Sequence, residues 1–219
     1  MGHFDPYDDN GGTVAAIAGQ DYVLIASDSR LSTGSTILSR FTPKIYPLSK
    51  VTVFACAGFH GDVLTLVKQL EIRMKLYVHE HGEEMSTKAM MALLLPTLYG
   101  RRFFPYYVRP IVAGLDREGR GLVASYDPIG TPEFFDYVIQ GSAENLVHPF
   151  LNNQIGAKKT LSDVPIQAPP ELTLEKAVKL LKDSFLAAAE RDVYTGDTVT
   201  LMAITAKGTE TTEYQLRRD

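Results

Sequence analysis

The spacing of the apolar residues changes period four times along this chain, and no other feature limits the possible folds as strongly. Segments with the alternation of β-strands come in hairpin pairs, and the segments between them repeat at the spacing of amphipathic helices. The predicted order is therefore strands, two helices, strands, two helices and strands. The expected strands cover residues 13–18, 22–27, 44–47, 51–57, 108–115, 121–126, 199–205 and 211–216, and the expected helices cover residues 62–81, 86–98, 143–152 and 174–190.

Hairpin-rich sheets with amphipathic helices between them predict a layered architecture. Each helix can cover one apolar sheet face, and two such sheets can stack through their remaining apolar faces. We therefore expect an α/β (α+β) fold, a four-layer α/β/β/α sandwich. A chain of 219 residues is long enough for one such core, and no repeat or linker divides it. Residues 12–219 are predicted to form a single domain behind a short N-terminal leader, residues 1–11.

Composition and charge exclude several classes of protein. The formal net charge is −4 and the basic residues are scattered, which argues against a nucleic-acid-binding surface. Cys56 is the only cysteine and lies in an apolar run, which is typical of a reducing compartment. Residues 1–12 lack the features of a secretory signal, and no apolar run approaches the ~20 residues of a membrane span. We expect a protein of the cytoplasm and nucleus that contacts no membrane.

Two polar segments suggest other chemistry and need a separate interpretation. His79 and His81 are two residues apart, so they do not share a helix face, and we expect a charged helix end rather than a metal site. The run from Arg101 to Tyr107 interleaves basic and aromatic residues, as some proteins that bind single-stranded nucleic acid do. Because this run is short and the chain is acidic, we favour a packed turn or a protein interface.

Three positions near predicted strand ends are separated by equal intervals. Gly12 precedes the first strand, Asp28 ends the second and Lys44 opens the next, each sixteen residues after the last. The same spacing separates the nucleophilic threonine, an aspartate and a lysine in proteasome β subunits, which are N-terminal-nucleophile hydrolases. Residues 26–30, Ala-Ser-Asp-Ser-Arg, also resemble that family's strand end. The resemblance implies a sandwich of the N-terminal-nucleophile hydrolase type.

Motifs further along the chain strengthen the resemblance. Residues 141–143 resemble the family's Gly-Ser element, and residues 192–197 resemble its Asp-x-x-Ser-Gly element. The resemblance extends from about residue 11 to the C-terminus. Residues 10–13 and 101–108 further resemble one type of β subunit, at the sixth position of the ring. The counterparts of the family's further active-site residues are Ser142, Asp192 and Thr195.

The residue at the nucleophile position decides what chemistry the resemblance implies. In active family members a threonine hydroxyl attacks the substrate, and the free α-amino group of the same residue acts as the base. Gly12 offers no hydroxyl, so no catalysis is expected. Thr13 is shifted by one residue along a strand, which turns its side chain to the opposite face. Without a nucleophile, the degenerate site is expected to brace the sheet ends through Asp28, Lys44, Asp192 and Thr195.

The resemblance implies a structural subunit of the 20S proteasome core particle. Its partners are then the other α and β subunits of a 28-subunit barrel of four stacked rings, through which unfolded protein substrates pass, and no cofactor or metal is implied. A neighbouring subunit's substrate pocket is expected to be lined by Tyr126, Asp127, Pro128 and Ile129. Two alternatives stay open: an active threonine peptidase that uses Thr13 after residues 1–12 are removed, and a free-standing domain of the same fold. We expect the leader to remain attached, which disfavours the first.

Overall fold

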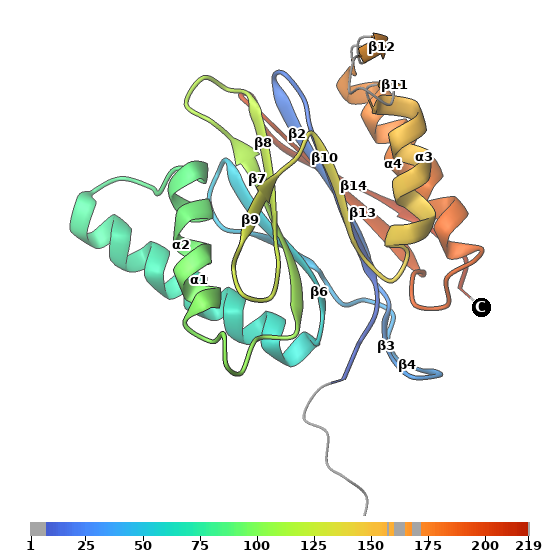
Figure 1. Ribbon diagram of the computed structural model, residues 1–219, viewed down its shortest axis with the longest axis horizontal. Coiled ribbons are helices and arrows are strands. Elements are labelled where there is room, and N and C mark those ends of the chain that lie inside the picture. The colour runs from blue at the N-terminus through green and yellow to red at the C-terminus, as the bar shows by residue number, and fades with distance from the viewer. Residues whose placement is uncertain (1–7, 157, 160–164, 168–171, 219) are drawn as a thin grey trace, which may run out of the picture.

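Two stacked antiparallel sheets form the centre of the computed structural model, which describes residues 8–156, 158–159, 165–167 and 172–218 (Figure 1). The first sheet has the order β10-β1-β2-β13-β14 and contains β1 (Thr13–Ala18), β2 (Tyr22–Asp28), β10 (Tyr137–Gly141), β13 (Thr198–Thr205) and β14 (Gly208–Gln215). The second has the order β5-β6-β7-β8-β9 and contains β5 (Ile45–Pro47), β6 (Thr52–Gly58), β7 (Val108–Leu115), β8 (Gly121–Tyr126) and β9 (Pro132–Phe134). Two short hairpins lie outside these sheets: β3 (Leu31–Thr33) with β4 (Thr36–Ser39), and β11 (Lys158–Lys159) with β12 (Pro165–Gln167).

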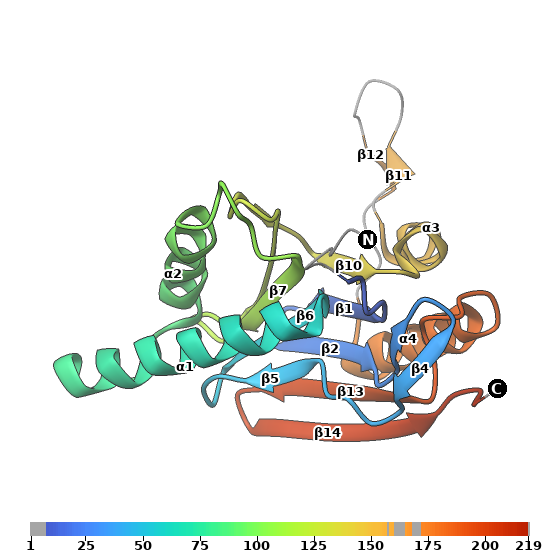
Figure 2. The same cartoon turned by 90° about the horizontal axis from the view of Figure 1, so that it is seen from below.

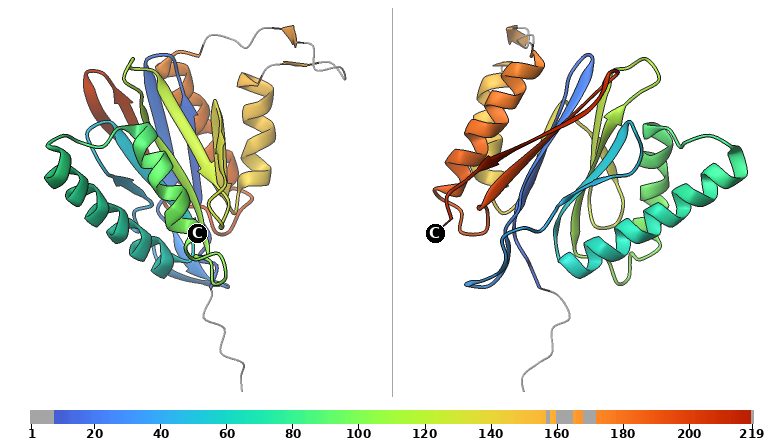
Figure 3. Two further views of the ribbon diagram at one scale, coloured as in Figure 1. Left: turned by 60° about the vertical axis from the view of Figure 1, so that its left-hand side comes forward. Right: turned by 180° about the vertical axis from the view of Figure 1, so that it is seen from behind.

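Helices cover the outer faces of both sheets (Figures 2 and 3). The second sheet carries α1 (His60–His81) and α2 (Thr87–Tyr99), and the first carries α3 (Glu144–Ile155) and α4 (Leu174–Ala189). Local sequence sets the helix ends: the side chains of Ser86 and Thr173 cap α2 and α4, and Gly82 ends α1 with a φ of 71°. The predicted four-layer sandwich is thus confirmed. None of the helices in the described part of the chain combines the length and apolar character needed to cross a membrane.

Three apolar clusters fill the spaces between the four layers. Successive side chains of a strand point to opposite faces, so β1 sends Val14 into the space between the sheets and Ala15 toward α3 and α4. In the second sheet, Val53 lies between the sheets, and Phe54 and Cys56 lie beneath α1 and α2. Because both faces of the central strands are buried, their sequences read as continuous apolar runs. Burial raises the pKa of the Cys56 thiol, as its position in an apolar run would lead one to expect.

Several short strands were not predicted. The hairpin of β3 and β4 and the strand β9 are short, and their side chains are mostly half-buried or exposed, with Ser32 as a buried exception. Strand β10 contains the strand-favouring residues Tyr137, Val138 and Ile139, which the prediction overlooked, and forms five residue pairs with β1. The predicted helix of residues 143–152 continues to Ile155. Of the expected proline-rich loop, Pro165 lies in β12, and Pro169 and Pro170 lie outside the described residues.

The strand register brings the ends of three strands of the first sheet together. Val14 pairs with Ser27, and Asp28 pairs with Val199, so the start of β1, the end of β2 and the start of β13 meet at one end of the sheet. Gly12 lies directly before β1 at this end. Pairing of β1 with β2 therefore places Gly12 near Asp28, and pairing of β2 with β13 brings the segment before β13 to the same end of the sheet.

Candidate functional site

A buried ion pair lies where β1 and β2 converge. Lys44 Nζ donates to Asp28 Oδ1 at 2.8 Å, to the carbonyl oxygen of Asp28 at 3.1 Å and to that of Arg30 at 2.7 Å. The Asp28 carboxylate also accepts hydrogen bonds from the backbone nitrogens of Thr13, at 2.8 Å, and Gly196, at 3.3 Å. Complete burial raises the pKa of Asp28, while the Lys44 ammonium group and these two amides oppose that rise by stabilising the carboxylate.

Gly12 faces this ion pair, and a side chain at this position would require the end of the Lys44 side chain to move. A Cβ atom built on Gly12 would lie 2.4 Å from Lys44 Cε, 2.7 Å from Lys44 Nζ and 3.0 Å from Asp28 Oδ1. The φ of Gly12 is +82°, in the left-handed region that residues with a side chain rarely adopt. The position that corresponds to the family's nucleophile therefore points at Lys44, and a residue with a side chain would be strained there.

A cluster of hydroxyl groups adjoins the ion pair. The hydroxyls of Thr195 and Ser142 both donate to Asp192 Oδ2, each at 2.6 Å. Thr13 Oγ1 lies 2.8 Å from Thr195 Oγ1, so the Thr13 hydroxyl belongs to this cluster rather than to the surroundings of Lys44. The structure thus brings Ser142, Asp192 and Thr195 together from the β10–α3 and α4–β13 loops.

Asn10, which the sequence showed only as part of the motif of residues 10–13, fastens the end of the leader to the domain. Asn10 is buried, with only 4% of its surface exposed. Its Nδ2 donates to Ser32 O at 3.1 Å and Thr33 Oγ1 at 3.3 Å, while its Oδ1 accepts from His60 N at 2.8 Å. Burial, with the nearby charge of Lys44, lowers the pKa of the His60 imidazole. No local pattern could reveal this role, because the partners of Asn10 lie 22 and 50 residues away.

Replacing Asn10 with alanine is expected to lower the free energy of unfolding by about 1–3 kcal/mol, because buried backbone groups of Ser32 and His60 would lose their partner. Urea unfolding of the purified chain measures this change. Asn152→Ala is a matched control, since Asn152 is exposed and should change stability by less than about 0.5 kcal/mol. Equal effects of the two substitutions would contradict a fastening role for Asn10.

A second buried charge cluster lies at the end of the 192–197 element. Arg30 Nε donates to Asp197 Oδ2 at 2.9 Å, and Arg40 Nη1 donates to Asp197 Oδ1 at 2.5 Å. Asp197 is 1% exposed and has a φ of 71°. The two guanidinium groups hold the pKa of Asp197 below its ordinary value, against the opposing effect of burial. This cluster ties β13 to the segments on either side of the β3–β4 hairpin.

The segment expected to line a neighbour's pocket needs one correction. Tyr126 is buried beneath α1 and α2, and its hydroxyl donates to Met91 O at 2.7 Å, so this side chain cannot reach a neighbouring subunit. Asp127, Pro128 and Ile129 are exposed in the turn between β8 and β9. They lie at the end of the second sheet that also carries Gly58, because β6 and β8 both pair with β7 in register.

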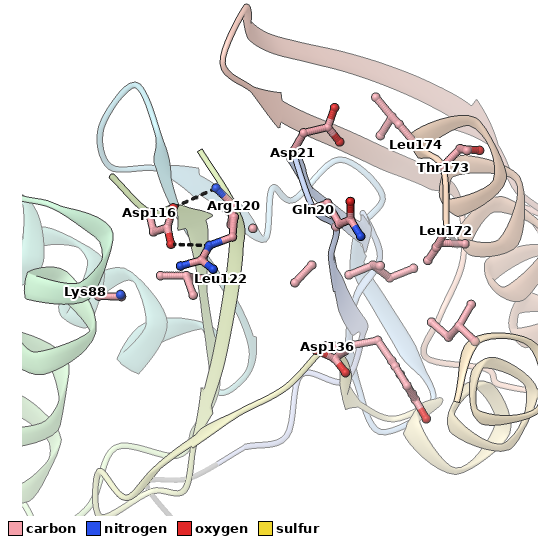
Figure 4. Close-up of a pocket in the computed structure, with 16 residues that line it drawn as sticks. Gln20, Asp21, Lys88, Asp116, Arg120, Leu122, Asp136, Leu172, Thr173 and Leu174 are labelled. Atoms are coloured by element: carbon pink, nitrogen blue, oxygen red, sulfur yellow. Dashed lines mark hydrogen bonds and ion pairs between the residues drawn. The ribbon is translucent and has the colours of Figure 1, made fainter. Parts of the chain in front are cut away.

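A large cavity lies away from this site. It has a volume of about 1090 Å³ and opens between the β1–β2 and β7–β8 turns (Figure 4). Ile17 and Ala18 line it at the end of β1 opposite Gly12. Asp116 and Arg120, which form an ion pair with each other, also line it. Its position at the far end of β1 separates it from the residues that the sequence motifs bring together.

Comparison with known proteins agrees with the geometry of the site. A family model described as proteasome subunit matches residues 8–204. The chain belongs to the proteasome subunit family. It is 50% identical to the proteasome subunit beta type-1-B of Carassius auratus over 218 residues, which cover 99% of this chain and 90% of that protein. The beta type-1 subunits of Drosophila melanogaster and Arabidopsis thaliana are 46% and 45% identical over 99% of this chain and 91% and 97% of those proteins.

These relatives confirm the family resemblance seen in the sequence motifs. The chain is a proteasome β subunit, and the predicted similarity to the beta type-1 subunit is confirmed. As a proteasome subunit it is a component of a proteolytic complex, assembles with other proteasome subunits and takes part in protein degradation.

Proposed function

We propose that this chain is a non-catalytic, structural β subunit of the 20S core particle. The observation that carries the proposal is Gly12, which faces Lys44 without a hydroxyl group and in a backbone conformation that strains a residue with a side chain. Threonine peptidase chemistry needs a hydroxyl within hydrogen-bond reach of its base. The Asp28–Lys44 pair then has a structural task, since it holds the end of β2 to the segment that opens β5.

Thr13 is a poor substitute for the missing nucleophile. Its hydroxyl is 2.8 Å from Thr195 Oγ1 and accepts from Ala143 N at 3.1 Å, and its residue is fully buried. Its nitrogen is an amide that donates to Asp28 Oδ1, so it cannot act as a base. Catalysis by Thr13 would require cleavage of the chain before residue 13 and rearrangement of these hydrogen bonds.

In this role the chain completes a β ring in a 28-subunit barrel of the cytoplasm and nucleus, next to α and β subunits. The exposed turn of Asp127, Pro128 and Ile129 contributes to the substrate pocket of an adjoining catalytic subunit. The names of the relatives and the exposure of this turn support the proposal. The free-standing alternative is disfavoured because relatives that cover nearly the whole chain are named as proteasome subunits.

Labelling of the assembled complex with an electrophilic peptide directed at N-terminal threonines tests the proposal. We expect intact-mass spectrometry to find the label on catalytic subunits and this chain unmodified, with the same peptide lacking its electrophile as the control. Label on Thr13, with residues 1–12 absent, would establish the peptidase alternative. Native mass spectrometry that recovers the chain as a monomer from its own cells would establish the free-standing alternative.

A further inference from the structure

Exposed aromatic side chains gather in the loop that joins α2 to β7. Tyr99, at the end of α2, is 50% exposed, and Phe103 and Phe104 are 88% and 60% exposed. The loop lies at the end of the second sheet where Gly58 of β6 pairs with Val108 of β7 (Figure 1). Aromatic residues and arginine are enriched at protein interfaces, and clustered exposed apolar surface marks interaction sites.

The backbone of this loop is held in place by hydrogen bonds. Those within the loop join Arg101 N to Leu98 O at 2.9 Å, Arg102 N to Tyr99 O at 3.0 Å and Phe104 N to Arg101 O at 2.9 Å. At its other end, Tyr106 is buried beneath α1 and α2, and Tyr107 N donates to a carboxylate oxygen of Asp62 at 2.8 Å. The exposed rings therefore project from an ordered turn, which reduces the entropy lost when a partner binds.

Arg102 is stacked against two of these rings. Its Cζ lies 4.4 Å from the ring centroid of Phe103 and 5.2 Å from that of Tyr99, and its Nη1 donates to the Tyr99 hydroxyl. A guanidinium group carries five N–H donors in one plane, so the stacked group still presents donors at its edge. Two adjacent N–H groups at such an edge can donate to the two oxygens of one carboxylate in a bidentate arrangement.

We propose that Tyr99, Arg102 and Phe103 form a docking surface for an acidic segment of another proteasome subunit. A carboxylate of the partner pairs with Arg102, and an apolar socket beside it takes the Phe103 ring. Charge supports an acidic partner: residues 99–109 contain three arginines and no Asp or Glu, although the chain as a whole has a net charge of −4. The inference rests on the proposed role as a ring subunit.

A photo-crosslinking phenylalanine analogue at position 103 identifies the occupant in the assembled complex. We expect a crosslink to one other proteasome subunit, within a segment that contains Asp or Glu. A complex that contains this chain but yields no such crosslink overturns the docking surface alone. Recovery of the chain outside any complex overturns the proposed function as well, so the two failures are distinguishable.

Charge reversal at Arg102 tests the electrostatic part of the proposal. In competition with the unaltered chain, incorporation of Arg102→Glu into the complex is expected to fall by more than about tenfold. Arg117→Glu is the matched control, because Arg117 is exposed in the β7–β8 turn at the opposite end of the second sheet, and its incorporation should change less than about twofold. The two variants should have the same midpoint temperature of thermal unfolding.

Two results would overturn the acidic-partner proposal. One is equal incorporation of Arg102→Glu and Arg117→Glu. The other is binding of a single-stranded oligonucleotide by the unaltered chain that Arg102→Glu abolishes while incorporation is retained, because this would assign the loop to nucleic acid.

Discussion

Replacing Asp197 with asparagine is expected to lower the free energy of unfolding by about 3–5 kcal/mol. The substitution removes the carboxylate that neutralises Arg30, whose side chain is 4% exposed, and leaves that guanidinium group buried without its counter-charge. Asparagine accepts a φ of 71° nearly as well as aspartate, so the backbone is not strained. Urea unfolding of the purified chain at neutral pH measures the effect.

The same carboxylate makes stability depend on pH in the acid range. The pKa of Asp197 in the folded chain is lowered from its ordinary value of 3.8 by Arg30 and Arg40. Its contribution is therefore fully present above pH ~4 and is lost as the pH falls through the lower pKa of the folded state. The unaltered chain should lose stability over that acid range, and Asp197→Asn should lose correspondingly less.

An exposed ion pair provides the control for this prediction. Glu190 lies 2.8 Å from Arg217, and both side chains are more than half exposed, so Glu190→Gln should cost less than about 1 kcal/mol. A loss for Asp197→Asn as small as that for Glu190→Gln would show that the buried cluster contributes no more than a surface pair.

Restoring threonine at position 12 is expected to produce no peptidase and to destabilise the chain. A φ of +82° for a residue with a side chain costs about 1–3 kcal/mol, and the added Cβ would also collide with Lys44 Cε, 2.4 Å away. The nitrogen of residue 12 remains an amide because Gly11 precedes it, so the new hydroxyl would have no α-amino base. Threonine-directed labelling of the complex and urea unfolding measure the two effects.

Gly12→Ala separates the steric effect from the chemical one. Alanine adds the same Cβ without a hydroxyl, so it should destabilise the chain to a similar extent. Label on residue 12 of the Gly12→Thr variant with the leader still attached would contradict the account of catalytic silence. Unchanged stability in both variants would show that Lys44 and the leader move aside at little cost.

The main elements could be predicted because their signals are local. Runs of strand-favouring apolar residues located β1, β7 and β8 with the ends that the structure has, and the capping residues Ser86 and Gly82 located the helix ends. Strand β10 was overlooked although Tyr137, Val138 and Ile139 favour strands, and the strands of the β3–β4 hairpin are short. In the structure β10 pairs with β1, and β3 and β4 pair with each other in a separate two-stranded sheet.

The candidate site could likewise be predicted only where its signals are local. Equal spacing singled out Gly12, Asp28 and Lys44, and the structure brings them into contact. Asn10 and Asp197 were seen only as parts of motifs, because their partners lie as many as 167 residues away in the sequence. The side chain of Tyr126 points inward because it packs beneath α1 and α2. The sequence alone could not show this packing.

The sequence by itself determined the four-layer architecture and the missing hydroxyl at position 12. Both depend on residue type and local spacing, which are properties of the chain before it folds. The tertiary structure decided that Lys44 fills the space in front of Gly12, that the Thr13 hydroxyl bonds to Thr195 and that Asn10 fastens the leader. These contacts depend on strand register and side-chain direction, because a hydrogen bond requires atoms from distant segments to meet within about 3 Å.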